Sequence, residues 1–389
     1  MTYVRQCILH FGIPKTGSTS IQESLSSGLT DPDFYYPDLG HSNHSMFLEA
    51  AFSEKPELYH ANYKRGIGRE QLLSERPAVL QRLADEIGRC GPRTMVLSAE
   101  HLLHFKQSES TDLLAFFSGQ ACQLQLVAYV RPMRGLVESL FTQALREPGW
   151  RVPAESLTWV MKRKTFCGHI QSKDAVFGRD RVTLWPFSPA HFPQGCVVQD
   201  FCRRIGMKTM PGVVRRSNER LALPAIRLLH AYRTFGPGYG TGPNVIDENA
   251  NLLRHLETLK GPSFHFHSEF LDDYCRRHEA DIAWMESRLG ASLRDGMGQD
   301  KDEHAIRVES DLLAFCPDSL EWLAERTGTA FRTLAHGDPS QLAAAVHLLR
   351  LIPFNAEAQA ESTISSPSFV GKLRQHAHAM LSWARRGVR

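Results

Sequence analysis

The chain has 389 residues, of which 42% are hydrophobic and 22% are charged, and its formal net charge is +3. A chain of this length and composition is typical of a soluble globular protein of about two domains, and the small charge gives no support for nucleic-acid binding. No apolar run reaches the ~18 residues of a transmembrane helix, and no signal peptide begins the chain, so we expect a cytoplasmic protein.

The cysteines of the chain bear on its metal and redox chemistry. No two of the eight cysteines form a CxxC motif, and several of them lie in apolar patterns. Small buried thiols are the interpretation we favour, because zinc sites need paired ligand spacing. We therefore expect neither a disulfide framework nor a metal site.

Short apolar strands alternate with amphipathic helices over the first 235 residues. The strand candidates are Val4–Phe11, Thr94–Ser98, Gln123–Val130 and Arg181–Trp185. The helix candidates are Ser18–Ser26, Ala78–Cys90, Thr111–Gly119, Met133–Arg146 and Gln194–Ile205. This alternation predicts an α/β fold with a parallel sheet and helices on both faces. The helix at Ala78 is expected to begin after Pro77.

Two other regions differ from this pattern. Residues 30–68 are rich in Tyr, His, Pro and Asn, which predicts a long polar loop region with short helices. After a glycine–proline break near Phe235 the patterns are helical, at Ala250–Leu259, Ser268–Leu289, Ser310–Arg326, Ser340–Leu351 and Ser368–Arg386. We therefore predict an α/β core over residues 1–235 and a helical extension packed on it over residues 236–389.

A candidate phosphate-binding loop follows the first strand, in the stretch CILHFGIPKTGSTS. Gly12 and Gly17 have the spacing of the motif GxxxxGK[ST], but the lysine stands inside the loop at Lys15. Backbone N–H groups and the start of the next helix can hold an anion there. The residues assigned to this site are Pro14, Lys15, Thr16, Gly17, Ser18, Thr19 and Ser20. The alternative is a serine-rich helix cap with a solvated lysine.

A second motif lies in LQLVAYVRPMRGLVESLF, where an apolar strand ends at Arg131. Pro132 suits the first turn of the next helix, and Ser139 follows about two turns later. Ligands bind at the carboxyl ends of strands in open parallel sheets, and arginine offers a planar fork of donors. Arg131 and Ser139 are therefore expected to grip one dianion. The alternative is a structural ion pair and a surface serine.

The loop GIPKTGSTS and the segment YVRPMRGLVESLF together resemble the two cofactor-binding motifs of the bacterial-type sulfotransferases that depend on 3′-phosphoadenosine 5′-phosphosulfate (PAPS). The resemblance covers roughly residues 4–235 and implies a P-loop NTPase-like sheet. It implies that the first motif binds the 5′-phosphosulfate and that Arg131 and Ser139 bind the 3′-phosphate. It also suggests Trp185 or Phe187 near the adenine ring, with core packing as the alternative. It suggests Arg215 or Arg216 near the 3′-phosphate, with a helix cap at Ser217 or Asn218 as the alternative interpretation of that segment.

A third segment, TMVLSAEHLLHF, supplies candidates for the general base. Its strand ends at Ser98, and Glu100 and His101 follow at the same sheet edge as the loop. An acceptor hydroxyl loses a proton as it attacks sulfur, so a base must lie within hydrogen-bond reach. Glu100 is the first candidate, His44 in the polar loop region the second, and His101 the third. A surface or capping role is the alternative for each.

The sequence therefore predicts a sulfotransferase that moves a sulfuryl group from PAPS to an acceptor hydroxyl by in-line displacement, with no metal requirement. The acceptor is expected to be a small molecule, a carbohydrate or a glycolipid. Lys15 would neutralise charge on the leaving phosphate oxygen. Two alternatives remain: a P-loop kinase or NTPase, and a non-catalytic module that binds the nucleotide. The oligomeric state is not predicted.

Overall fold

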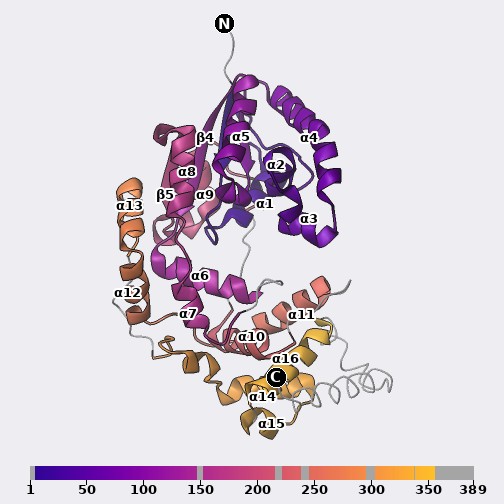
Figure 1. The fold of residues 1–389 in the computed structure, drawn as a ribbon, viewed down its shortest axis with the longest axis vertical. Helices are drawn as coiled ribbons and strands as arrows, with labels where there is room; N and C mark the ends of the chain where they lie inside the picture. The colour runs from indigo at the N-terminus through magenta and orange to yellow at the C-terminus, as the bar shows by residue number, and fades with distance from the viewer. Residues whose placement is uncertain are drawn as a thin grey trace. The chain divides into compact units, whose positions relative to one another are not determined.

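The computed structural model describes residues 5–146, 152–214, 221–237, 245–294, 303–336 and 338–354 (Figure 1). Arg216 and the predicted helix Ser368–Arg386 lie outside these ranges. The chain forms two compact units. The first unit comprises Met1–Leu136, Lys164–Asn218 and His278–Asp295, and the second comprises Val137–Arg163, Glu219–Arg277 and Gly296–Arg389. The predicted domain boundary at residue 235 stays a prediction.

Five strands form one parallel sheet in the first unit, in the order β2-β3-β1-β4-β5. They are β1 (Arg5–His10), β2 (Phe34–Tyr35), β3 (Thr94–Ser98), β4 (Cys122–Val130) and β5 (Val182–Pro186). The four predicted strands and the predicted α/β fold are confirmed. The sequence missed β2, because two residues inside a polar region are too short a pattern to stand out.

Strand β1 lies in the middle of the sheet, between β3 and β4. Leu9 lies beside Leu97 of β3 on one side and beside Leu126 of β4 on the other. The chain turns to opposite sides of β1 in its two halves, so β1 stands at the switch point of the sheet. Ligands of open parallel sheets bind at such points, beyond the carboxyl ends of the strands.

Helices cover both faces of this sheet. The longer helices of the first unit are α1 (Ser18–Gly28), α2 (Ser45–Phe52), α4 (Arg69–Cys90), α5 (Gln107–Gly119), α8 (Cys167–Phe177), α9 (Val197–Arg204) and α13 (Glu279–Leu289). The shorter elements are α3 (His60–Arg65), η1 (Pro56–Leu58), η2 (Glu100–His104), η3 (Arg179–Arg181), η4 (Pro189–His191) and η5 (Pro193–Gly195). Ile21 of α1 and Phe201 of α9 join Ile8 and Val127 in one buried cluster on one face. On the other face, α4, α5 and α8 contact β3, β4 and β5.

The start of α4 corrects one prediction. The helix begins at Arg69 and runs through Pro77, whereas the sequence placed its start after that proline. Proline removes one backbone donor and leaves one carbonyl without its helical partner. Pro77 lies on the exposed side of α4, where water can satisfy that carbonyl. Arg76 beside it donates to the carbonyl oxygens of Ala50 and Ser53, which ties this turn to α2.

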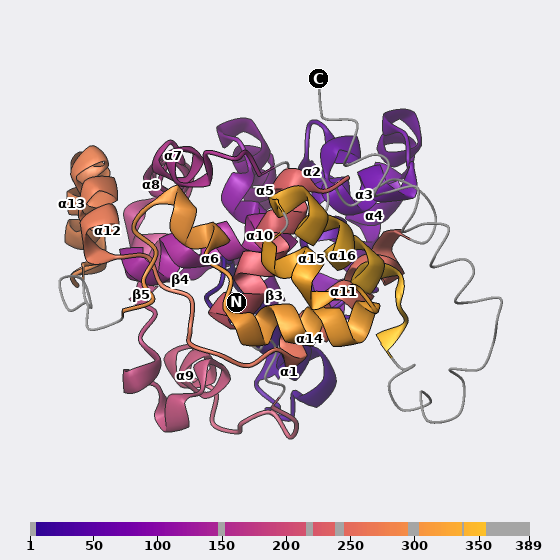
Figure 2. The same cartoon turned by 90° about the horizontal axis from the view of Figure 1, so that it is seen from below.

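The named elements of the second unit are helices. It contains the greater part of α6 (Met133–Arg146), with α7 (Ser156–Met161), α10 (Leu223–Phe235), α11 (Val245–Thr258), α12 (Ser268–Arg277), η6 (Glu309–Leu313), α14 (Pro317–Thr327), α15 (Phe331–His336) and α16 (Pro339–Leu351). Helices α10, α11 and α14 pack on α16 (Figure 2). Buried Arg350 of α16 donates to Asn249 of α11, with 2.8 Å between Nε and Oδ1. No helix within the described ranges is both long and apolar enough to span a membrane.

Candidate functional site

The loop from Phe11 to Gly17 joins β1 to α1 and has an unusual backbone. Gly17 caps α1 in the left-handed conformation, with φ of 80°, and no side chain caps this helix start. Lys15 is also left-handed, with φ of 63°. For a residue other than glycine this conformation costs on the order of 1–3 kcal/mol and persists where the surroundings impose it, often at functional sites. The loop therefore presents the uncapped N–H groups of α1 beside a strained lysine.

Ser18 marks the space in front of α1. Its side chain is 4% exposed, and its Oγ has no hydrogen-bond partner among the described residues. A Cβ added at Gly12 would lie 2.5 Å from this Oγ and 2.6 Å from Cγ of Glu100, so only glycine fits there. A buried hydroxyl without a partner is costly. An anion at the start of α1 would satisfy it together with the N–H groups of the helix.

The other hydroxyls of the loop have different surroundings. Thr16 is buried, and its Oγ1 donates to the carbonyl oxygen of Ile13 at 2.8 Å. Its side chain therefore shapes the loop and leaves only the backbone N–H for a ligand. Thr19 is exposed and Ser20 is buried. Pro14 is half-buried, as is Lys15.

Arg131, after β4, lies against this loop. Its Nη1 donates to the carbonyl oxygen of Lys15 at 3.0 Å, and its guanidinium lies 5.5 Å from the centre of the Phe187 ring. A Cβ at Gly135 would lie 2.4 Å from its Nε, so the first turn of α6 leaves room for the guanidinium. Phe187 is fixed in turn by its N–H, which donates to Val130 at 2.7 Å. Three residues predicted from separate motifs thus lie together at the ends of β1, β4 and β5.

The contacts above do not test two of the predicted cofactor residues. Ser139 lies on α6, in the part of the helix that belongs to the second unit, and its carbonyl oxygen accepts a hydrogen bond from Thr142. Arg216 lies outside the described residues. Their roles stay predictions.

The carboxyl end of β3 is held by a buried network around Ser98. The Nδ1 of His10 lies 2.8 Å from Oγ of Ser98, and the side chain of Gln22 donates to the same oxygen at 3.1 Å. Burial lowers the pKa of His10 to about 4, so its ring is neutral. This network ties the strand before the loop to the strand before Glu100.

His44, the second candidate base, belongs to the same network. The backbone N–H of Ser98 donates to its Nδ1 at 3.2 Å, so the ring proton is on Nε2, which donates to the carbonyl oxygen of Pro37 at 3.1 Å. The ring is buried, and burial lowers its pKa to about 4. Both ring nitrogens are engaged inside the protein, and the geometry favours the other two candidates over His44.

His101, the third candidate, lies in η2 and has a buried carboxylate as a partner. Its Nδ1 is hydrogen-bonded to Oε1 of Glu49, a residue of α2 that is 3% exposed, and its backbone N–H donates to Oγ of Ser45. The side chain of His101 is 36% exposed. Glu49 has no motif around it, and only the packing of α2 against η2 reveals its role. Sequence reasoning therefore missed it.

Tyr59 lies near Glu49, His101 and Glu100. Desolvation, with smaller contributions from the charges of Glu49 and Glu100, raises its pKa to about 12, against the lowering effect of a hydrogen bond with Ser45. Its ring meets that of His101 edge-on, with 4.9 Å between the centres. Glu49, Glu100 and His101 therefore surround one tyrosine at the end of β3.

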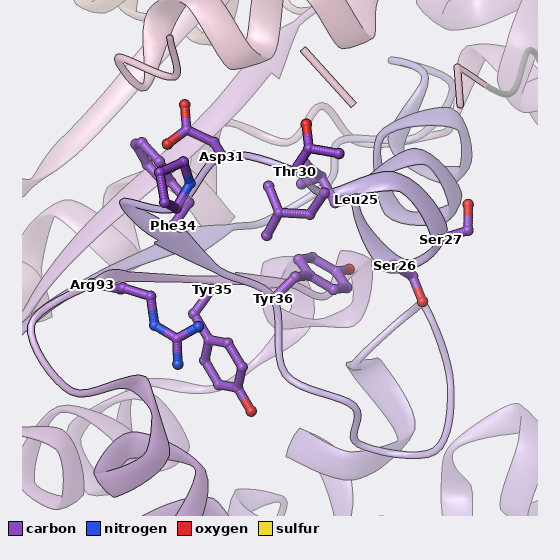
Figure 3. Close-up of a pocket in the computed structure, with 11 residues that line it drawn as sticks. Leu25, Ser26, Ser27, Thr30, Asp31, Phe34, Tyr35, Tyr36 and Arg93 are labelled. Atoms are coloured by element: carbon purple, nitrogen blue, oxygen red, sulfur yellow. The ribbon is translucent and has the colours of Figure 1, made fainter. Parts of the chain in front are cut away.

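A separate cavity of about 320 Å³ opens in the first unit (Figure 3). It is lined by the last turn of α1, by the start of β2 and by Arg93, which precedes β3. These are the amino-terminal ends of the strands, so the cavity lies at the opposite edge of the sheet from the loop. The guanidinium of Arg93 lies 4.4 Å from the centre of the Tyr35 ring and donates to the carbonyl oxygen of Cys90. We place the candidate site at the loop because the uncapped helix start is there.

Metal-binding side chains do not gather in the described part of the chain, where no three His, Cys, Asp or Glu side chains come together as ligands. Comparison with known proteins finds no matching family model and no matching curated protein. Among solved structures, the chain is similar to a sulfotransferase from Alicyclobacillus acidocaldarius. The two share 15% identity with a TM-score of 0.41, over 74% of this chain and 97% of that chain. The assignments for this chain rest on the contacts described above.

Proposed function

We propose that this protein is a sulfotransferase that uses PAPS as its donor and a hydroxyl group as its acceptor. The observation that carries the proposal is the cluster formed by the loop, Arg131 and Phe187 in front of an uncapped helix. It combines a helix start that attracts anions, two cations and an aromatic ring. A nucleotide with two separate anionic groups and a planar base has the matching chemistry.

The residues of the loop fit the 5′-phosphosulfate of such a donor. The N–H groups at the start of α1 and the unpartnered Oγ of Ser18 would bind its oxygens. Arg131 and Ser139 would bind the 3′-phosphate, and Phe187 would lie near the adenine ring. When bound, the donor supplies a sulfuryl group attached to a phosphate leaving group.

Lys15 then has the main electrostatic role. As the acceptor oxygen bonds to sulfur, the bond between sulfur and the bridging phosphate oxygen breaks, and negative charge develops on that oxygen. A cation held at this position stabilises the transition state more than the ground state. The left-handed backbone of Lys15 and the hydrogen bond from Arg131 to its carbonyl oxygen define the main chain at this lysine.

The acceptor's proton must go to a base at the end of β3. Two candidates, Glu100 and His101, lie on η2, which begins beside the loop. The polar region that contains α2, α3 and Tyr59 would form part of the acceptor site. Its tyrosines and histidines suit a polar small molecule or a carbohydrate, whose hydroxyls need hydrogen-bond partners.

A P-loop kinase or NTPase is the second function that the loop suggests. It needs a lysine directly after Gly17 and an aspartate at a strand end to organise magnesium. Ser18 follows Gly17, β3 ends at Ser98 and β4 ends before Arg131. None of these three positions carries the residue that a kinase requires, and the geometry favours sulfuryl transfer.

Transfer of labelled sulfate tests the proposal. The full chain is incubated with [³⁵S]PAPS and fractionated carbohydrate and small-molecule extracts, in buffer that contains EDTA. We expect label in an acceptor fraction, and we expect Lys15→Ala to lower the rate by about a hundredfold or more. Ser27→Ala, an exposed residue in the last turn of α1 and away from the loop, is the control and should retain most of the rate. Absence of sulfate transfer together with magnesium-dependent phosphate transfer from ATP would contradict the proposal.

A further inference from the structure

The pairing of His101 with Glu49 has the features of an oriented base. A buried carboxylate that binds one nitrogen of an imidazole fixes the tautomer and stabilises the imidazolium that forms when the other nitrogen takes a proton. Glu49 is 3% exposed and bonds to Nδ1. Among the described residues no hydrogen bond reaches Nε2 of His101, and the side chain is 36% exposed. The lone pair of Nε2 is therefore available to a ligand.

The contrast with the other two candidates supports the same choice. His44 has both nitrogens bonded inside the protein. Glu100 packs against the loop, where its Cγ would contact a side chain at Gly12. A carboxylate at that place lies beside the proposed anion site, where its own charge opposes the approach of the donor. An imidazole such as that of His101 carries no negative charge and so avoids this repulsion.

We propose that Glu49 is a positioning residue that holds His101 with Nε2 as the acceptor of the proton released by the acceptor hydroxyl. This inference rests on the proposed function. The acceptor oxygen forms its bond to sulfur, the bond between sulfur and the bridging phosphate oxygen breaks, and the hydroxyl proton passes to Nε2. The resulting imidazolium is balanced by the carboxylate of Glu49, and the leaving phosphate keeps the electron pair.

Titratable groups face this imidazole from neighbouring elements: Glu49 on α2, Tyr59 before α3, and Glu100 and His104 on η2. His169 and Lys173 on α8 lie behind them, near His104. Desolvation, with smaller contributions from His101, His169 and Lys173, lowers the pKa of His104 to about 4. His104 is therefore neutral near pH 7, and among the described residues Glu49 is the buried carboxylate that bonds to the ring of His101.

The matched pair of variants is Glu49→Gln and Glu86→Gln. Both carboxylates are 3% exposed, but Glu86 lies on α4 and bonds to Tyr35 and Arg89, away from η2. A glutamine at position 49 keeps the shape of the side chain, but its amide can donate as well as accept. It therefore no longer fixes the tautomer of His101.

Three measurements on the full chain test the proposal. Calorimetry with adenosine 3′,5′-bisphosphate should give a Kd within about twofold of wild type for both variants, because neither residue touches the loop. In ¹⁵N-histidine NMR of the neutral imidazole, wild-type His101 should carry its proton on Nδ1, and Glu49→Gln should lose this preference. The rate of sulfate release from PAPS to water should fall about tenfold or more in Glu49→Gln and stay unchanged in Glu86→Gln.

Each contrary result has a distinct meaning. A wild-type His101 with its proton on Nε2 overturns the proposal, and that measurement does not depend on how the variants fold. A Glu49→Gln rate equal to wild type, with Glu100→Gln slow, also overturns it and assigns the proton to Glu100. If the wild-type chain does not bind the nucleotide, the proposed function is contradicted. The NMR measurement of the His101 tautomer still tests its pairing with Glu49 in that case.

Discussion

An arginine lies over an aromatic ring at each edge of the sheet in the first unit. At the carboxyl edge the guanidinium of Arg131 lies 5.5 Å from the centre of Phe187, and at the amino edge that of Arg93 lies 4.4 Å from the centre of Tyr35. The amino edge also has the cavity of about 320 Å³. Judged by shape and residue types alone, the amino edge would be the better binding site.

The two edges of the sheet differ in the charges and dipoles of the groups beside each arginine. Helix α1 presents its N–H groups at the carboxyl edge, whereas its last turn lines the cavity with the carbonyl end of the helix. Asp31 adds a negative charge to the cavity, and its pKa is held below the ordinary value mainly by backbone N–H donors at Thr209, Asp33 and Lys208. An anion is therefore favoured at the loop and opposed at the cavity. The direction of a helix and the local charge decide which of two similar arrangements is a site.

Exchange of each arginine for alanine tests this comparison most strongly. Arg131→Ala removes a charged donor from the proposed 3′-phosphate site, and hydrogen bonds to charged groups contribute about 1.5–3 kcal/mol. We expect the Kd for adenosine 3′,5′-bisphosphate to rise about 10- to 100-fold. Arg93→Ala removes the equivalent group at the amino edge and should leave this Kd unchanged. Calorimetry on both variants measures the difference.

The opposite result for the two arginine variants would assign the nucleotide site to the other edge of the sheet. If Arg93→Ala weakened nucleotide binding and Arg131→Ala did not, the cavity at the amino edge would be the nucleotide site. Circular dichroism of both variants serves as the control, because each arginine also packs on a ring and contacts backbone carbonyls.

A separate effect, on stability and not on nucleotide binding, is expected from pH, and it should begin at the carboxyl edge. Burial lowers the pKa of His10 and of His44 to about 4, below the ordinary value of 6.5. Between pH 6.5 and 4 the unfolded chain binds protons at these rings that the folded chain does not. The free energy of unfolding therefore has its full value above pH 6.5. On acidification below this pH it decreases by about 1.4 kcal/mol per pH unit for each histidine.

Urea unfolding at pH 7 and pH 5 measures this loss, and hydrogen exchange locates it. Amides around Ser98 should lose protection at pH 5 before those of Phe34 and Tyr35, because no histidine lines the amino-edge cavity. Equal free energies of unfolding at the two pH values would show that these histidines are not buried in the neutral form.

Much of the fold was predictable because it depends on local patterns. The strands at Thr94–Ser98 and near Val130, and the helix Met133–Arg146, follow from apolar runs and from the proline after Arg131. The early start of α4 was not predictable, because an exposed helix tolerates Pro77 where solvent replaces the lost hydrogen bond. The two residues of β2 acquire their strand geometry only from pairing with β3.

The site shows the same division. The loop and Arg131 belong to motifs with fixed spacing, and the sequence placed them at one sheet edge before any contact was known. The choice among Glu100, His44 and His101 depends on which ring nitrogens are already bonded, and this is a property of packing. Glu49 has no signal of its own, because its partner lies 52 residues away along the chain.

The most direct test of the central claim is calorimetry of the wild-type chain with adenosine 3′,5′-bisphosphate in buffer that contains EDTA. The loop, Lys15 and Arg131 should bind this nucleotide without a metal ion, and adenosine 5′-monophosphate should bind at least about tenfold more weakly because it lacks the 3′-phosphate. Failure to bind adenosine 3′,5′-bisphosphate, together with tight binding of ATP and magnesium, would contradict the account.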